Sequence, residues 1–107
     1  MDDDLFISRH TLADRLGRPD APLVIDVRRE ARFSSADHRV ATALRAVPPL
    51  PTSQDLVLYC VHGHEVSQQA AREWRAAGRR AWVLEGGIEG GEPGVDDAGF
   101  VERVRSE

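Results

Sequence analysis

The sequence predicts a three-layer α/β domain built around a mainly parallel sheet. Three runs of aliphatic and β-branched residues, at 22–28, 55–60 and 81–84, are too short for helices and largely apolar. Strands of this kind are buried on both faces, which requires a parallel sheet with helices on each side. Helical segments separate the runs along the chain, and this alternation favours right-handed crossover connections.

The N-terminal part contains a short apolar run at residues 5–7. The apolar spacing that follows predicts a helix over residues 9–16. Ser8 is a candidate N-cap, because its hydroxyl can accept a hydrogen bond from an N–H group of the first turn. Gly17 and Pro19 end the helix, since neither residue continues it well. The helix therefore leads directly into the first long strand.

The region between residues 29 and 54 carries weaker signals. Residues 30–35 predict a short helix, and Asp37 with His38 predicts a turn. Residues 44–47 predict a brief strand. Regular structure is then broken by three prolines, because proline donates no backbone hydrogen bond: Pro48, Pro49 and Pro51.

The strongest helical pattern covers residues 66–77 and ends at Gly78. Apolar residues at helical spacing predict its buried face: Val66, Ala70, Trp74 and Ala77. Beyond the strand at 81–84, the sequence EGGIEGG predicts a glycine-rich turn. Residues 97–104 predict a last helix, whose inward residues would be Phe100, Val101 and Val104.

Length and charge limit the function classes. The 107 residues fit one domain over residues 1–107. The net charge of −4 argues against a general affinity for nucleic acid or for an anionic membrane. An acidic N-terminus and the lack of a long apolar run argue against a secretory signal or a membrane span, so we expect a cytoplasmic protein.

The only cysteine of the chain, Cys60, ends the strand at 55–60 and opens the stretch CVHGHE. One thiol excludes an internal disulfide and a dithiol mechanism within the chain. A lone cysteine at a strand end is commonly a small buried hydrophobe, but two imidazoles and a carboxylate poorly continue a core segment. In open parallel sheets, ligands bind beyond the carboxyl ends of the strands, where Cys60 lies.

The loop after Cys60 is expected to curl before the helix begins, and Gly63 permits the tight curve. Its N–H groups and the helix N-terminus would then form a site for an anion. A cysteine at the start of such a loop would have a stabilised thiolate and a pKa below the free-cysteine value of about 8.5. We therefore expect Cys60 to be a nucleophile.

Several motifs follow one another along the chain: Asp26-Val27-Arg28, Phe33, His38, Cys60-Val61-His62-Gly63, the helix at 67–77 with Gly78, and Val83-Leu84-Glu85-Gly86-Gly87-Ile88. In this order they resemble the rhodanese, or single-domain sulfurtransferase, family, and the resemblance covers nearly the whole chain. It implies a three-layer rhodanese-like domain with a central, mainly parallel five-stranded sheet flanked by helices. It also implies that Cys60 takes sulfane sulfur from a small anionic donor such as thiosulfate. The resulting persulfide would pass the sulfur to a thiol, cyanide or protein acceptor, without a cofactor.

The chemistry of the remaining candidates suggests their roles. Backbone N–H groups of one segment would bind the substrate by holding the persulfide and the departing anion: Val61, His62, Gly63, His64, Glu65 and Val66. The imidazoles of His62 and His64 could favour an anionic donor, cap the helix or pack the loop. The carboxylate of Glu65 is expected to cap the first turn of the helix. Asp26 and Arg28 are expected to tie the strand end to neighbouring loops, and Arg32 is a further candidate for a cation in the pocket.

Three alternatives compete with a sulfurtransferase. A phosphatase or arsenate reductase on the same fold would need an arginine at Val66, because an aliphatic side chain cannot neutralise a dianion. A rhodanese-like module could instead be a non-enzymatic sulfur carrier or a regulatory protein-binding domain, although the presence of a cysteine favours activity. A metal site is not expected, since no second cysteine supports it and a curled loop would turn its possible ligands apart: Cys60, His62, His64 and Glu65.

Overall fold

The centre of the structure is a four-stranded parallel sheet with the strand order β1-β5-β4-β2. The computed structural model describes residues 5–36, 38–47, 54–62, 65–90 and 100–103. Along the chain, its elements are β1 (Phe6–Ile7), α1 (Arg9–Arg15), β2 (Leu23–Asp26), α2 (Glu30–Ser35), β3 (His38–Val40), β4 (Leu56–Tyr59), α3 (Glu65–Ala76), β5 (Ala81–Leu84) and β6 (Val101–Arg103). The three predicted long strands are confirmed as β2, β4 and β5, and their pairing is parallel.

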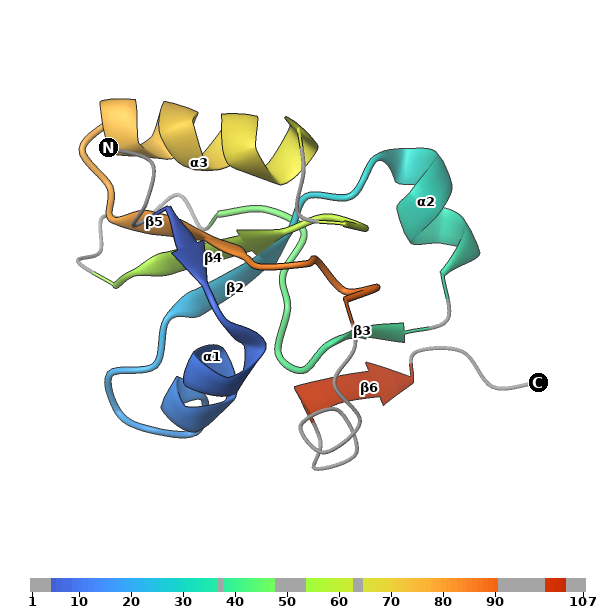
Figure 1. Cartoon of the computed structure of the whole chain (residues 1–107), viewed down its shortest axis with the longest axis horizontal. Coiled ribbons are helices and arrows are strands. Elements are labelled where there is room, and N and C mark those ends of the chain that lie inside the picture. Colours follow the sequence, from blue (N-terminus) through green and yellow to red (C-terminus); the bar gives the residue numbers. More distant parts are fainter. Residues whose placement is uncertain (1–4, 37, 48–53, 63–64, 91–99, 104–107) are drawn as a thin grey trace.

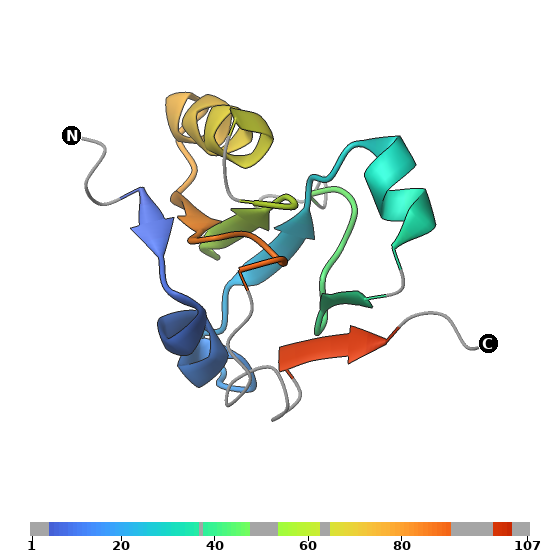
Figure 2. The same cartoon turned by 45° about the vertical axis from the view of Figure 1, so that its right-hand side comes forward.

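Helices cover both faces of this sheet, which confirms the predicted three-layer arrangement. Figure 1 and Figure 2 show α3 over one face, α1 over the other, and α2 beyond the carboxyl end of β2. Successive strand residues point to opposite faces, so each strand feeds two hydrophobic clusters. The cluster on the α1 side contains Leu12, Val24 and Val57, and the cluster on the α3 side contains Ile25 and Leu58. β4 is buried along its whole length, as a central strand must be.

Within the described residues, the parallel sheet has four strands instead of the predicted five. The predicted strand at 44–47 contributes one parallel bridge, between Leu44 and Ile25, with two backbone hydrogen bonds of 2.7 and 2.8 Å to β2. Arg45 then donates from its guanidinium to two backbone carbonyls at the end of β2, at 3.0 and 2.7 Å. Because side-chain donors occupy carbonyls that a longer ladder would use, the pairing stops after one bridge.

The predicted C-terminal helix at 97–104 is wrong at residues 101–103, which form β6. β6 pairs antiparallel with β3 in a separate two-stranded sheet, with Val101 opposite Val40. Phe100 is buried, as predicted, and its carbonyl accepts a backbone hydrogen bond of 2.7 Å from the residue after β3. The rest of the predicted helix lies outside the described residues. Apolar spacing alone could not reveal that a distant segment supplies a partner strand.

Between β2 and β4 the predictions succeed in part. The short helix predicted at 30–35 is confirmed as α2. The turn predicted at Asp37 and His38 is wrong at His38, which begins β3, while Asp37 lies outside the described residues. Pairing with β6 makes this segment extended. The three prolines at 48, 49 and 51 also lie outside the described residues.

The predicted helices at 9–16 and 66–77 are confirmed as α1 and α3, with one correction to a buried face. Ser8 is the N-cap of α1, and its Oγ accepts a hydrogen bond of 3.1 Å from the N–H of Thr11. In α3 the fully buried residues are Ser67 and Ala71, while Ala77 lies beyond the helix and is exposed, contrary to the prediction. Small side chains allow the helix to approach the sheet closely, so the buried face is centred one residue further along the chain than the apolar pattern suggested.

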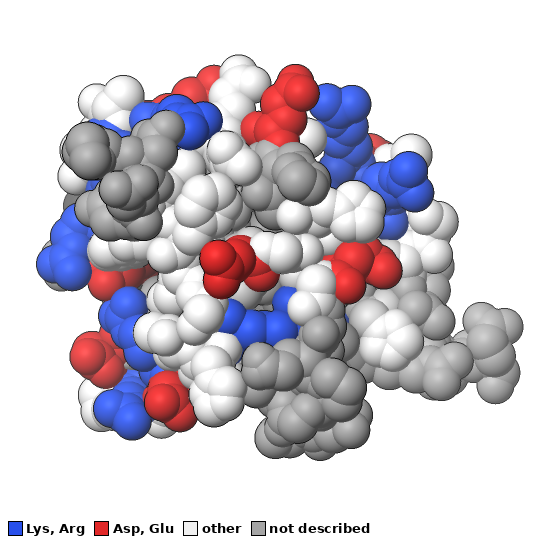
Figure 3. Space-filling model, viewed as in Figure 1, with Lys and Arg blue, Asp and Glu red and all other residues white. Residues whose placement is uncertain are grey.

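One face of the molecule carries mixed charges. On the face drawn in Figure 3, basic and acidic side chains are interspersed among the described residues, without one continuous basic area. A nucleic-acid-binding surface would instead gather basic side chains on one face. Within the described part of the chain, no helix has the length and apolar character needed to cross a bilayer.

Candidate active site

Cys60 is the first residue after β4 and lies at the carboxyl edge of the sheet, as the sequence predicts. The residue is 7% exposed. Its Sγ lies 3.1 Å from Oγ of Ser67, which is in the first turn of α3 and fully buried. The sulfur is therefore held between the end of a buried strand and the N-terminal turn of a helix, where the helix dipole favours an anion.

The glycine-rich turn after β5, at residues 85–90, holds the backbone of the segment that follows β4, the cysteine loop, whose described residues are 60–62. The N–H groups of Ile88 and Glu89 donate to the carbonyls of Cys60 and the residue after it, at 3.1 and 3.0 Å. Gly86 has a φ of +80°, and a Cβ added at Gly90 would lie 2.8 Å from the Gly86 backbone. Only glycine tolerates this conformation and this approach, so residues 85–90 build the turn that supports the loop.

A buried cation fixes the same turn from α1. Arg9 is 5% exposed, and its guanidinium donates to the carbonyls of Gly87 and Ile88 at 2.6 and 2.7 Å. The guanidinium also lies 5.3 Å from the centroid of the Phe100 ring. Sequence alone does not indicate this role, because a charged residue at the start of an amphipathic helix usually faces solvent. Arg9 thus supports the cysteine loop through the turn.

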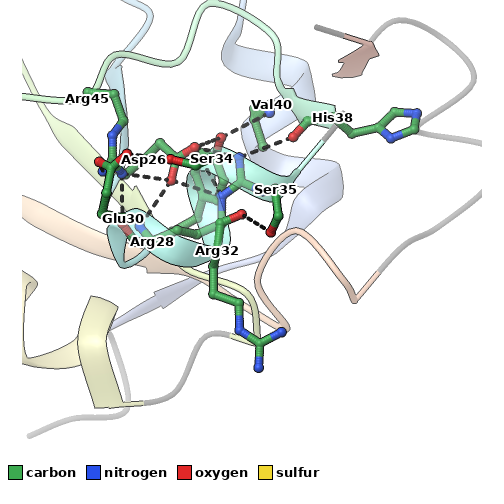
Figure 4. A network of polar contacts seen from close by, with 10 residues as sticks. Asp26, Arg28, Glu30, Arg32, Ser34, Ser35, His38, Val40 and Arg45 are labelled. Carbon is green, nitrogen blue, oxygen red and sulfur yellow. Dashed lines mark hydrogen bonds and ion pairs between the residues drawn. The ribbon is translucent and has the colours of Figure 1, made fainter. Parts of the chain in front are cut away.

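A pocket of about 240 Å³ opens at Cys60. Its described lining comes from the end of β2 with α2, from the cysteine loop, and from the first turn of α3: Arg28, Arg29, Arg32, Cys60, Val61, His62, Glu65 and Val66. Arg28 is buried, whereas Arg29 and Arg32 are exposed. Figure 4 shows the guanidinium of Arg32 pointing away from the polar network around Asp26. Three guanidinium groups against one carboxylate make the described lining suitable for an anion.

Arg28 is fixed by the buried carboxylate of Asp26 (Figure 4). Asp26 accepts hydrogen bonds from Nε and Nη2 of Arg28, at 3.0 and 2.6 Å, and from the hydroxyl of Tyr59, at 3.0 Å. Nη2 also donates to the carbonyl of His38 at 3.1 Å. Burial alone would lower the pKa of Arg28, but the hydrogen bonds and charge of Asp26 outweigh it and raise that pKa. Burial, together with the Asp26 charge, raises the pKa of Tyr59, so its hydroxyl remains a donor.

None of the residues of α2 is fully buried, so apolar burial contributes little to holding this helix. Cation–π contacts attach it to the sheet instead. The ring centroid of Phe33 lies 4.0 Å from Cζ of Arg45 and 5.8 Å from Cζ of Arg28. Arg45 is itself hydrogen-bonded to the end of β2. The aromatic ring is therefore enclosed by two anchored guanidinium groups. This attachment places Arg29 and Arg32 beside the cysteine loop.

The structure brings most of the predicted site residues together. Six of them line the pocket: Arg28, Cys60, Val61, His62, Glu65 and Val66. Glu65 begins α3, and its carboxylate also contributes a negative charge to the pocket. Gly63 and His64 lie outside the described residues. Arg28 lines the pocket. Asp26 does not line it but contacts the pocket indirectly, through its hydrogen bond to Arg28.

Two polar residues at the site were missed from the sequence. Arg29 lines the pocket, although the sequence indicates a role only for its neighbours Arg28 and Arg32. Ser67 contacts the sulfur, although the helix face was predicted from apolar residues alone. The signal for Ser67 was its position four residues before Ala71, because residues at this spacing share one face of a helix.

The described residues do not assemble a metal site. Within them, no three histidine, cysteine, aspartate or glutamate side chains are grouped to hold a metal ion. His64, one of the possible ligands considered, lies outside the described part of the chain. The described pocket gathers guanidinium groups, which are always charged and oppose a cation.

The chain is similar to several proteins of known structure. A rhodanese-like domain protein from Staphylococcus aureus is 20% identical, with a TM-score of 0.65, over 83% of this chain and 93% of that one. The thiosulfate sulfurtransferase from Pseudomonas aeruginosa is 25% identical, with a TM-score of 0.67, over 91% of this chain and 19% of that one. Reduced CoADR-RHD from Bacillus anthracis is 17% identical, with a TM-score of 0.68, over 91% of this chain and 18% of that one. The chain thus spans less than a fifth of the length of these two longer proteins.

No match was found among curated protein sequences. The family model of the rhodanese-like domain matches residues 8–92. This range includes β2 with its Asp26–Arg28 pair, the cysteine loop, α3 and the glycine-rich turn. The fold, the order of these motifs and the extent of the match agree, and the chain belongs to the rhodanese-like domain family.

Proposed function

We propose that the protein is a sulfurtransferase that moves sulfane sulfur from thiosulfate or a similar anionic donor to a thiophilic acceptor through a persulfide on Cys60. The observation that carries this proposal is the opening of the only cysteine of the chain into a pocket whose described lining holds three arginines. A nucleophilic sulfur beside cations suits an anionic donor. The likeness to a thiosulfate sulfurtransferase from Pseudomonas aeruginosa supports the same donor class.

The reaction has two displacement steps at sulfur. In the first, the Cys60 thiolate attacks the outer sulfur of thiosulfate, the S–S bond of the donor breaks, and sulfite leaves with the bonding electron pair. In the second, a nucleophile such as cyanide or a thiolate attacks the outer sulfur of the persulfide. The new S–S bond then breaks, and its electron pair returns to Cys60 Sγ as a thiolate. No electrons are gained from or lost to a further reagent, so neither step needs a cofactor.

The direct test is the mass of the intact protein. Reduced protein is incubated with thiosulfate, freed of excess donor and weighed by mass spectrometry. The expected result is a gain of one sulfur atom, which cyanide then removes with formation of thiocyanate. An unchanged mass after incubation with thiosulfate would contradict the persulfide and with it the proposed donor.

Steady-state kinetics should show a ping-pong mechanism, because the single thiol must take up sulfur from the donor (charging) before it can pass that sulfur to the acceptor (discharge). Double-reciprocal plots of initial rate against thiosulfate, at several fixed cyanide concentrations, are expected to be parallel. Parallel lines arise because sulfite leaves before cyanide binds. Intersecting lines would mean that both substrates are bound at once, and would count against a free persulfide intermediate.

The cations of α2 should contribute to donor binding. In Arg29→Gln/Arg32→Gln, kcat/KM for thiosulfate is expected to fall about tenfold, because two exposed charge contacts of about 0.5–1 kcal/mol each are lost. The dependence of kcat/KM on salt should weaken in parallel, since salt screens the contacts that the variant lacks.

Arg18→Gln is the matched control for this variant. Arg18 is also exposed, but it precedes β2 at the opposite end of the sheet from Cys60. The control should keep both kcat/KM and its salt dependence. An equal loss of free energy per arginine removed, in the control and in the double variant, would assign the effect to net charge and not to the pocket.

The same geometry also suits a sulfur carrier or a regulatory module. The match to the Bacillus anthracis CoADR-RHD covers 18% of the length of that protein, so domains of this kind occur within longer proteins. A carrier would gain mass from thiosulfate but would discharge slowly to cyanide and quickly to one protein partner. A regulatory module would not gain mass at all. Turnover with small substrates therefore separates the three possibilities.

A further inference from the structure

A buried hydroxyl contacts the reactive sulfur from α3. Ser67 is fully buried, and its Oγ lies 3.1 Å from Sγ of Cys60. The next buried residue on this face, one turn later, is Ala71, which packs against the sheet within an apolar cluster. Alanine favours a helix more than serine does, and a buried hydroxyl costs free energy unless it forms a hydrogen bond. The position is therefore explained by the sulfur that it contacts and not by packing.

The state of the sulfur decides the direction of this hydrogen bond. Either atom can donate when Cys60 is a thiol. A thiolate has no proton and only accepts, so the hydroxyl of Ser67 must then donate to it. A hydrogen bond to a charged acceptor is about twice as strong as one between neutral groups. The contact is thus strongest when Sγ carries the negative charge.

We propose that Ser67 is a catalytic residue that stabilises the free thiolate of Cys60 more than its persulfide, and so makes Cys60 a better leaving group in the discharge step. The assignment of the two steps rests on the proposed sulfurtransferase function. In the persulfide, the negative charge resides on the outer sulfur, and Sγ is bonded to carbon and to sulfur. The donor hydroxyl of Ser67 faces Sγ, so it loses the charged acceptor on charging and regains it on discharge.

Removal of the hydroxyl should raise the pKa of the Cys60 thiol. In Ser67→Ala, the midpoint of iodoacetamide alkylation against pH is expected to move up by about one unit, in line with the loss of one hydrogen bond to a charged group. In the native protein the midpoint should lie below about 8.5, the value of a free cysteine. This measurement does not require any sulfur transfer.

The two half-reactions should respond in opposite directions. At a pH above both alkylation midpoints, Cys60 is fully ionised in both proteins, and only intrinsic reactivity remains. A more basic thiolate is a better nucleophile, so charging of Ser67→Ala by thiosulfate should become about threefold faster. The same thiolate is a poorer leaving group, so discharge by cyanide should become about threefold slower. Rapid mixing, acid quench and intact mass give both rates.

Two further variants separate this role from a structural one. Ser67→Thr keeps a hydroxyl and should restore the native midpoint and both rates. Ser35→Ala removes a helical hydroxyl that bonds to a backbone carbonyl in α2, away from the sulfur, and should change nothing. Unfolding by urea measures whether any variant has lost stability.

Each outcome bears on the proposal. An upward midpoint shift in Ser67→Ala, with faster charging and slower discharge, supports it. An unchanged midpoint overturns it, and so does an equal slowing of both half-reactions, which would indicate a loosened loop. If the native protein takes up no sulfur from thiosulfate, the proposed function fails, while the alkylation midpoint still decides whether Ser67 stabilises the thiolate.

Discussion

Cys60→Ser is expected to lower thiocyanate formation from thiosulfate and cyanide to the rate seen without protein. A serine hydroxyl stays protonated at neutral pH and is a poor nucleophile toward sulfur, so neither the persulfide nor its discharge can form. The substitution is nearly isosteric, and a hydroxyl at position 60 can still hydrogen-bond to Ser67, whose Oγ lies 3.1 Å from the native sulfur. The measurement is turnover at matched protein concentration, followed as coloured iron thiocyanate.

The fold of this variant must be checked independently. The urea midpoint and the near-ultraviolet circular dichroism of Cys60→Ser should match those of the native protein. Cys60→Ala provides a second inactive variant without a new hydrogen-bonding group. Turnover retained in either folded variant would end the assignment of Cys60 as the nucleophile, because the chain has no other thiol.

Asp26→Asn should cause a large loss of stability, of about 3–5 kcal/mol, because it removes one partner of a buried ion pair. Asp26 and Arg28 are 2% and 6% exposed, and the carboxylate also accepts from Tyr59. An amide cannot neutralise the guanidinium, which would remain as an uncompensated charge in the interior. The loss is a large share of the 5–15 kcal/mol typical of a domain, and urea unfolding followed by circular dichroism measures it.

Asp55→Asn is the matched control for this prediction. Asp55 is also buried, at 9% exposure, but its partners Arg15 and Arg80 are 28% and 72% exposed at their side chains. Water can solvate those guanidinium groups when the carboxylate is lost, so the expected cost is about 1 kcal/mol. Similar losses in Asp26→Asn and Asp55→Asn would contradict the interpretation of the Asp26–Arg28 pair as a buried support.

A double variant tests the same interpretation from the other side. Adding Arg28→Met to Asp26→Asn removes the uncompensated charge and should recover part of the lost stability. The same change removes a guanidinium from the pocket, so donor binding should weaken while stability improves. A double variant less stable than Asp26→Asn would mean that Arg28 contributes mainly through packing.

The sequence correctly predicts the elements that depend on residues close together in the chain. The aliphatic run that ends in Cys60 is a central strand because every residue of β4 can be buried. The capping serine at position 8 begins α1 because its side chain bonds within its own first turn. In the site, the position of a lone cysteine at a strand end, before a glycine-containing loop, was sufficient to nominate the nucleophile.

Predictions failed where the outcome depends on a distant partner. Residues 101–103 carry apolar spacing that fits a helix, but β3 offers them a strand to pair with. Leu44 begins the pairing of a fifth strand, and the pairing ends because Arg45 donates to the carbonyl of Asp26, the last residue of β2. Neither contact can be inferred from the residues on either side of it.

By itself, the sequence determined the layers of the domain, the order of its motifs and the identity of its only thiol, because these follow from short-range periodicity and from one residue type. Only the tertiary structure decided which charges and donors surround that thiol. Arg29 reaches the pocket through the attachment of α2, and Arg9 supports the loop from α1. Ser67 meets the sulfur because α3 packs closely on β4. Such contacts depend on the packing of segments that are separate in the chain, and local propensity does not encode that packing.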